Sequence, residues 1–194
     1  MRTPTIAGLT AALAVATLTA APAVASAHAG DAEARPVLHG HTAKLDALRA
    51  ATAEFRSGPA APWSVEVVDL AGISCIEDPH GTGAMGIHYL DATNLFDGRI
   101  DRLAPEALIY EPDEGGSLTL VAAEYLVIAD AWDAAHAAPP ILYGQRFSRV
   151  AAGNRYGLPD FYERHAWLWQ GNPSGTYADW NPDITCLGNG DNGG

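Results

Sequence analysis

Hydrophobic positions along this chain form one helical pattern and then a series of short strand-like runs. The helical pattern has apolar residues at Leu45, Leu48, Ala51 and Phe55. Thr42 precedes it as the expected N-cap, and the turn residues at 57–59 end it. The sequence therefore predicts a helix that begins at Thr42 and ends at Phe55.

Six apolar runs follow the helix, and turn residues separate them. They cover residues 63–70, 85–90, 107–110, 118–128, 141–147 and 165–169. Residues 130–138 predict a short helical segment, which the two prolines that follow it end. The predicted fold class is α+β and mostly β, with the N-terminal helix packed on an antiparallel sheet or small barrel.

The first 29 residues have the pattern of a signal peptide. Arg2 precedes an apolar run over residues 6–21, which is too short to span a bilayer. Small residues then offer cleavage after Ala27 or after Ala29. We therefore expect a secreted, extracellular protein. Its expected parts are a signal peptide (1–29), a flexible N-terminal arm (30–41), a single globular domain (42–186) and a disordered tail (187–194).

The chain is acidic, with 23 Asp and Glu residues against 11 Lys and Arg, and a formal net charge of -12. This charge disfavours nucleic acid and anionic membranes as partners. After the leader, no segment reaches the roughly 18 apolar residues that a transmembrane helix needs. The expected partner is a small-molecule or carbohydrate ligand.

Cys75 and Cys186 are the two cysteines of the chain. In an exported protein, two distant cysteines without CxxC spacing indicate a structural disulfide. The bridge is expected to hold the C-terminal segment against the start of the core.

A carboxylate interrupts the longest apolar run. Counting by twos places Glu124 on one strand face with Leu118, Leu120, Ala122, Leu126 and Ile128. An ionised carboxylate there must be protonated, paired or bound to a metal. His88 and His165 lie in two other strand-like runs, and with Glu124 they form a ligand set for zinc, iron or copper.

Two alternatives to this metal site stay open from the sequence. Glu124 can accept hydrogen bonds from Tyr89, Trp167 or His165 in a buried polar network. Cleavage after Ala27 would instead place His28 at the N-terminus, where its amine and ring can chelate copper.

Other residues are candidates for catalysis or ligand binding. Tyr89 and Glu111 are the candidate catalytic groups, beside a metal that acts as a Lewis acid on water or as a redox centre. The competing hypothesis is a non-catalytic module. It would bind a small molecule or a carbohydrate through Trp167, Trp169 and Trp180, of which the first two are expected on one strand face with His165.

Several motifs together resemble a family of small exported bacterial proteins without an established activity. The motifs are MGxHY at 85–89, PExLxYEP at 105–112 and HxWxWxxNP at 165–173. This resemblance implies a single exported domain with paired cysteines. A looser likeness to cupins concerns architecture alone, because the HxH pair of the chain, His39 and His41, lies outside the predicted strands.

Overall fold

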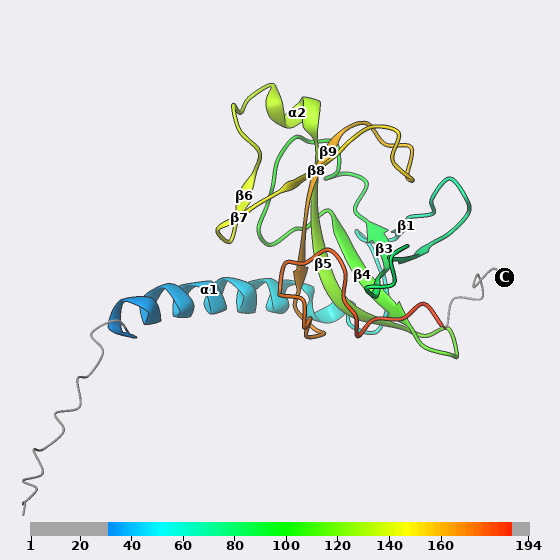
Figure 1. The fold of residues 1–194 in the computed structure, drawn as a ribbon, viewed down its shortest axis with the longest axis horizontal. Coiled ribbons are helices and arrows are strands. Elements are labelled where there is room, and N and C mark those ends of the chain that lie inside the picture. Colours follow the sequence, from blue (N-terminus) through cyan, green and yellow to red (C-terminus); the bar gives the residue numbers. More distant parts are fainter. Residues whose placement is uncertain (1–30, 188–194) are drawn as a thin grey trace, which may run out of the picture.

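The computed structural model describes residues 31–187, and their side chains from residue 42 onward (Figure 1). The predicted signal peptide and residues 188–194 of the predicted tail lie outside the described residues. In chain order the elements are α1 (Asp31–Thr52), the short 3-10 helix η1 (Ala53–Phe55), β1 (Val65–Glu66), β2 (Cys75–Glu77), β3 (Ala84–Leu90), β4 (Ala107–Pro112), β5 (Leu118–Ile128), α2 (Ala129–Asp133), β6 (Ile141–Leu142), β7 (Gln145–Arg146), β8 (Ser148–Val150) and β9 (Phe161–Trp167).

One antiparallel sheet dominates the fold. Its strands follow the order β1-β3-β4-β5-β9-β8, and β2 pairs with a second part of β3. β6 and β7 form a separate hairpin, whose turn residues Tyr143 and Gly144 both have a positive φ. Within the described part of the chain, the sheet stays open between β1 and β8. The fold is thus a mostly β, antiparallel sheet with few helices and one disulfide.

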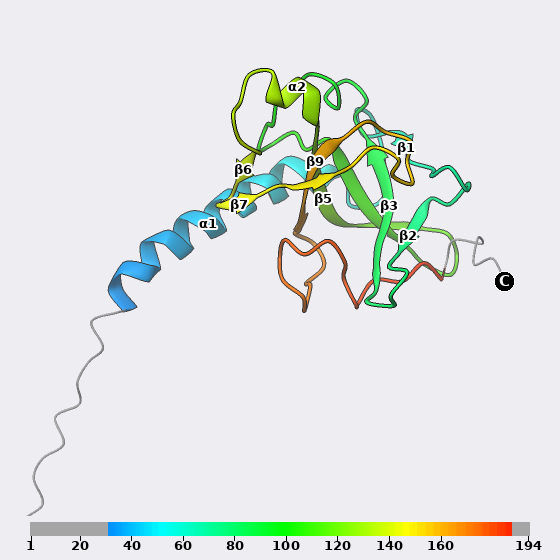
Figure 2. The ribbon, with the colours of Figure 1, turned by 45° about the horizontal axis from the view of Figure 1, so that its top comes forward.

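The N-cap expected at Thr42 is wrong. α1 already begins at Asp31, so Thr42 lies inside the helix. Residues 32–35 have high helix propensity, which favours a helix that begins before Thr42. Figure 1 and Figure 2 show the C-terminal part of α1 beside the sheet, where Leu45 and Leu48 are buried. No helix among residues 31–187 combines the length and apolar character needed to cross a bilayer.

The two faces of the sheet carry different clusters of apolar side chains. The face toward α1 packs Tyr110, Ala123 and Tyr125 with Leu48. The opposite face carries a cluster around Ile109, Ala122 and Trp167, and a neighbouring one around Leu126 and Phe161. Glu124 on this second face lies between the two clusters, because Ala122 belongs to the first and Leu126 to the second.

The predicted alternation along β5 is wrong in its first half. Tyr110 pairs with Leu120 and Ile109 pairs with Ala122, so Val121 is an extra residue in the ladder. This bulge reverses the side-chain pattern, because Leu120 packs toward α1 whereas Ala122 packs on the opposite face. Beyond the bulge, Ala122, Glu124 and Leu126 alternate on one face as predicted.

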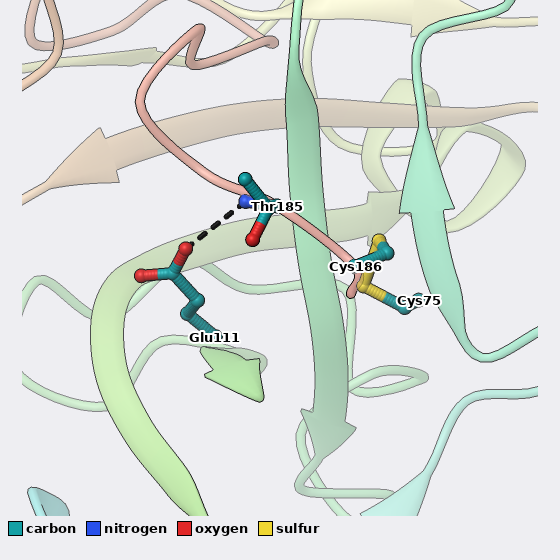
Figure 3. Close-up of a disulfide and its surroundings, with 4 residues drawn as sticks. All are labelled: Cys75, Glu111, Thr185 and Cys186. Carbon is teal, nitrogen blue, oxygen red and sulfur yellow. Dashed lines mark hydrogen bonds between the residues drawn. A yellow bond between two sulfur atoms is a disulfide. The ribbon is translucent and has the colours of Figure 1, made fainter. Parts of the chain in front are cut away.

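The predicted disulfide is confirmed. Cys75 on β2 is bonded to Cys186, 111 residues away, with the two Cα atoms 5.7 Å apart. Close by, the backbone N–H of Thr185 donates to Glu111 Oε1 at 3.0 Å (Figure 3). These two contacts hold the C-terminal segment against the sheet.

The last strand of the sheet differs from the predicted run at 165–169. β9 begins at Phe161 and ends at Trp167. The apolar pattern does not reveal the beginning of β9, because the charged residues Glu163 and Arg164 interrupt it. Trp169 lies beyond the strand and packs with the cluster toward α1, so it does not share a face with Trp167.

Candidate metal centre

The sheet brings His88, Glu124 and His165 together from three strands. Glu124 on β5 lies directly opposite His165 on β9. His88 is on β3, so β4 runs between it and Glu124. The β4 residue opposite Glu124 is Ala107, whose short side chain leaves room for His88 and Glu124 to meet across it.

The three side chains form a compact and buried group. His88 Nε2 lies 3.3 Å from Glu124 Oε2, and His165 Nε2 lies 3.7 Å from Glu124 Oε1. One potential ligand atom from each residue lies within 4.8 Å of the others. His88 and Glu124 are each 4% exposed and His165 is 0% exposed. Because zinc ligands about 2.0–2.2 Å from the ion lie roughly 3–3.5 Å apart in a tetrahedral site, small shifts would complete a coordination sphere.

Hydrogen bonds from the protein do not satisfy this group. His88 Nδ1 and both ring nitrogens of His165 are buried and have no hydrogen-bond partner. Two of the three donors proposed for a polar network are used elsewhere, because Tyr89 donates to Glu66 and Trp167 donates to the carbonyl of Ala178. The third, His165, faces Glu124 with its Nε2 3.7 Å from Oε1. Buried polar atoms without partners are rare in folded proteins, and an ion is one group that would satisfy them.

Burial and the neighbouring charges together set the protonation of the cluster. Burial, together with the nearby His165, lowers the pKa of His88 to about 3, so this ring is neutral at pH 7 and has a free lone pair. Burial also raises the pKa of Glu124 to about 8. Burial by itself lowers the pKa of His165, but the surrounding carboxylates, that of Glu124 foremost, raise it to about 9. The His165 ring therefore holds a proton at neutral pH, and a bound ion would have to displace that proton before His165 could act as a ligand.

Two further carboxylates surround the three candidate ligands. Asp179 Oδ1 lies 3.7 Å from His165 Nδ1, on the side of the ring away from Glu124. A carboxylate in this place orients a metal-bound histidine and increases its basicity. Glu163 precedes His165 by two residues on β9 and lines a pocket with His88 and Glu124. Burial raises the pKa of Glu163.

The sequence reasoning missed Glu163 and Asp179. A signal for Glu163 exists in the sequence, because Glu-x-His on a strand places both side chains on one face. The predicted strand began at His165, so it did not include Glu163. Asp179 lies 14 residues after His165, outside any strand, and no local pattern connects the two.

The other predicted site residues lie apart from the pocket beside the cluster. Tyr89 donates to Glu66 Oε2 at 2.9 Å, and its ring packs edge-on against Tyr110. Glu111 accepts the Thr185 N–H, and neither Tyr89 nor Glu111 lines the pocket.

The three tryptophans of the binding hypothesis do not share one cluster. Trp167 is buried on the face of the candidate ligands, where its indole donates to Ala178. Trp169 packs toward α1, with the Arg56 guanidinium 4.7 Å from its ring centre. Trp180 is partly exposed, and its carbonyl accepts a hydrogen bond from Asn172.

Comparison with known proteins gives no assignment: no family model, no curated protein and no solved structure matches this chain. The family resemblance of its motifs stays a prediction. The geometry of the site is thus the basis for a functional conclusion.

Proposed function

We propose that this chain is an exported, metal-dependent domain that binds one divalent transition ion through His88, Glu124 and His165. The observation that carries the proposal is the buried His–Glu–His group, whose ligand atoms lie within 4.8 Å of one another and in which three of the four histidine ring nitrogens lack a hydrogen-bond partner. Two imidazoles and one carboxylate suit zinc, iron or copper, and leave a coordination position open.

The reaction that these surroundings favour is Lewis-acid chemistry on a bound water molecule. The pocket at the cluster contains a second carboxylate, Glu163, beside His88 and Glu124. With an ion held by His88, Glu124 and His165 to acidify a water molecule, Glu163 would be placed to accept the proton of that water. We therefore assign the role of base to Glu163 and the roles of ligands to the two histidines and Glu124.

Export is part of the same proposal. It is supported by the leader-like pattern of residues 1–29 and by the disulfide between Cys75 and Cys186, a bond typical of oxidising compartments. The net charge of -12 supports a small-molecule ligand over nucleic acid.

Calorimetric titration of the metal-free chain with Zn²⁺ tests the proposal. We expect one zinc ion per chain, and the variants His88→Ala and His165→Ala should each weaken binding by more than about 100-fold, because each removes a ligand. His136→Ala is the matched control, since His136 is exposed and stacks on Trp132. It should bind zinc like the unmodified chain.

A second control addresses the N-terminal histidines. A His39→Ala/His41→Ala variant should retain the high-affinity site, because these residues precede the globular domain. Far-UV circular dichroism shows whether each variant folds. Zinc binding that persists in a folded His165→Ala variant, or that disappears in the His39→Ala/His41→Ala variant, would contradict the proposed site.

A further inference from the structure

The pocket beside the candidate ligands is closed to anything much larger than water. Its space is about 30 Å³, room for one or two water molecules. His88, Glu124 and His165 are each at most 4% exposed, so an ion or a substrate reaches them only when the protein around them moves. The proposed chemistry therefore requires that a part of the pocket wall opens.

The loop between β8 and β9 supplies two side chains of that wall, Tyr156 and Leu158. The loop lies beside the segment around β1 (Figure 2). Asn154 holds it in shape, because its side-chain amide donates to the carbonyls of Ala151 and Leu158. The side-chain oxygen of Asn154 accepts the N–H groups of Tyr156 and Leu158. A loop that is packed by its own contacts can move as one piece.

The same loop is tied to the segment after β1, which supplies another pocket residue, Val67. Arg155 Nη2 lies 2.7 Å from Asp69 Oδ2, and Arg155 Nε donates to the same oxygen at 3.0 Å. The Leu70 N–H donates to the carbonyl of Arg155 at 2.9 Å. The Leu70 side chain lies against Gly157, where an added Cβ would be 3.3 Å from it. These contacts join two parts of the pocket wall, one from each segment.

We propose that residues 151–158 form a flap over the candidate metal centre, and that the Asp69–Arg155 ion pair is the latch that keeps this flap closed. The inference rests on the proposed function, because the flap controls access to the same site. In the closed form there is space for water beside the ligands. Opening moves Tyr156 and Leu158 out of the wall and admits an ion or a substrate. Because the latch joins Arg155 to Asp69 and not to a ligand, it sets the rates of entry and exit and has little effect on affinity.

Rates of metal exchange test the latch. Co²⁺-loaded protein is mixed with an excess of the chelator EDTA, and the decay of its visible absorption gives the rate of release. Arg155→Ala should release Co²⁺ at least about fivefold faster than the unmodified chain, because the charged hydrogen bonds of the closed flap are lost. Uptake by the metal-free chain should accelerate by a similar factor, so the affinity should change by less than about threefold.

Arg149→Ala is the matched control. Arg149 lies on β8, and its ion pair with Asp160, at 2.9 Å, stays within the β8–β9 hairpin. Both rates should stay within about twofold of those of the unmodified chain, because this ion pair does not join the flap to residues 67–70. Arg155 is changed in preference to Asp69, since Asp69 Oδ1 also accepts the N–H groups of Ala71 and Ile73 and so shapes its own segment.

Hydrogen exchange of the metal-free chain tests the flap without an ion. The Leu70 N–H donates to the Arg155 carbonyl on the flap, whereas the Val67 N–H donates to the carbonyl of His88 on β3. In Arg155→Ala, exchange at Leu70 should be at least about fivefold faster and exchange at Val67 unchanged, because the flap opens while the sheet stays paired. NMR spectroscopy measures the two amides separately.

The outcomes separate the flap from the metal centre. A chain that binds no Co²⁺ would overturn the proposed function itself. A chain that binds Co²⁺ but releases it at the same rate with and without Arg155, or equally fast in Arg155→Ala and Arg149→Ala, would overturn the latch and leave the metal site in place. Exchange at Leu70 that is unchanged in Arg155→Ala, or that rises together with exchange at Val67, would show that residues 151–158 do not open as a flap.

Discussion

At the scale of single residues, Glu124 explains why the site exists and what it costs. Its carboxylate lies on a strand face between Ala122 and Leu126, 4% exposed to solvent. An unpaired charge in such a place is expensive. The energetic cost of Glu124 and its two histidines is understandable if a bound ion satisfies them, because a cation would compensate the carboxylate, accept the lone pair of His88 and replace the proton of His165.

Asp179 tests whether the surroundings of the site are organised for metal binding. Asp179→Asn keeps the shape of the side chain but removes the charge beside His165, and we expect zinc affinity to fall by about 10–100-fold. Asp183→Asn is the control, since Asp183 is exposed and only four residues away. Calorimetry with Zn²⁺ measures both. Equal affinities in the two variants would show that Asp179 does not position His165.

The sequence identified the three candidate ligands for a physical reason. His88, Glu124 and His165 are polar residues inside apolar, strand-like runs, and a buried polar residue stands out against that pattern. That they meet in space depends on β4 being placed between β3 and β5 and on Ala107 being small. Neither condition has a sequence signal without the pairing of the strands.

At the scale of elements, the pairing of β3 with β4 sets the position of His88. Gly86, two residues before His88, has a φ of +103°, and a Cβ there would lie 2.5 Å from the carbonyl oxygen of Tyr110. Glycine is thus required at this position for two reasons, its backbone conformation and the close approach of β4.

A pair of glycine variants separates these two requirements. Gly86→Ala should lower the free energy of unfolding by at least about 1–3 kcal/mol and weaken zinc binding, because β3 must move away from β4. Gly153→Ala is the control, since its φ is +81° but a Cβ there would meet nothing within 4 Å. Urea denaturation measures both. An equal loss in the two variants would mean that the contact with β4 contributes nothing.

The bounds of the elements were predictable where side-chain patterns are uninterrupted. The runs at 85–90 and 118–128 correspond closely to β3 and β5. β9 was predicted too short because Glu163 faces the pocket and Arg164 donates to the carbonyl of Tyr177, so its polar residues serve tertiary contacts. The bulge at Val121 was not predictable, because it arises from pairing with β4.

At the scale of the whole molecule, one sheet carries the three candidate ligands, and the disulfide ties the C-terminal segment to that sheet. A bridge that closes a loop of 111 residues stabilises the fold by roughly 4–5 kcal/mol in the chain-entropy model. The mostly β, antiparallel class and the bridge were predictable from the sequence. A series of short apolar runs separated by turn residues indicates such a sheet, and two distant cysteines in an exported chain indicate a disulfide. The order of the strands carries no such signal.

The metal centre is the central claim, and anomalous X-ray scattering tests it most directly. Crystals of the full chain grown with Zn²⁺ are measured above and below the zinc absorption edge. The account predicts one strong anomalous peak among His88, Glu124 and His165, about 2.0–2.2 Å from a ligand atom of each. A fully loaded crystal whose peaks lie elsewhere, with these three side chains free of metal, would contradict it.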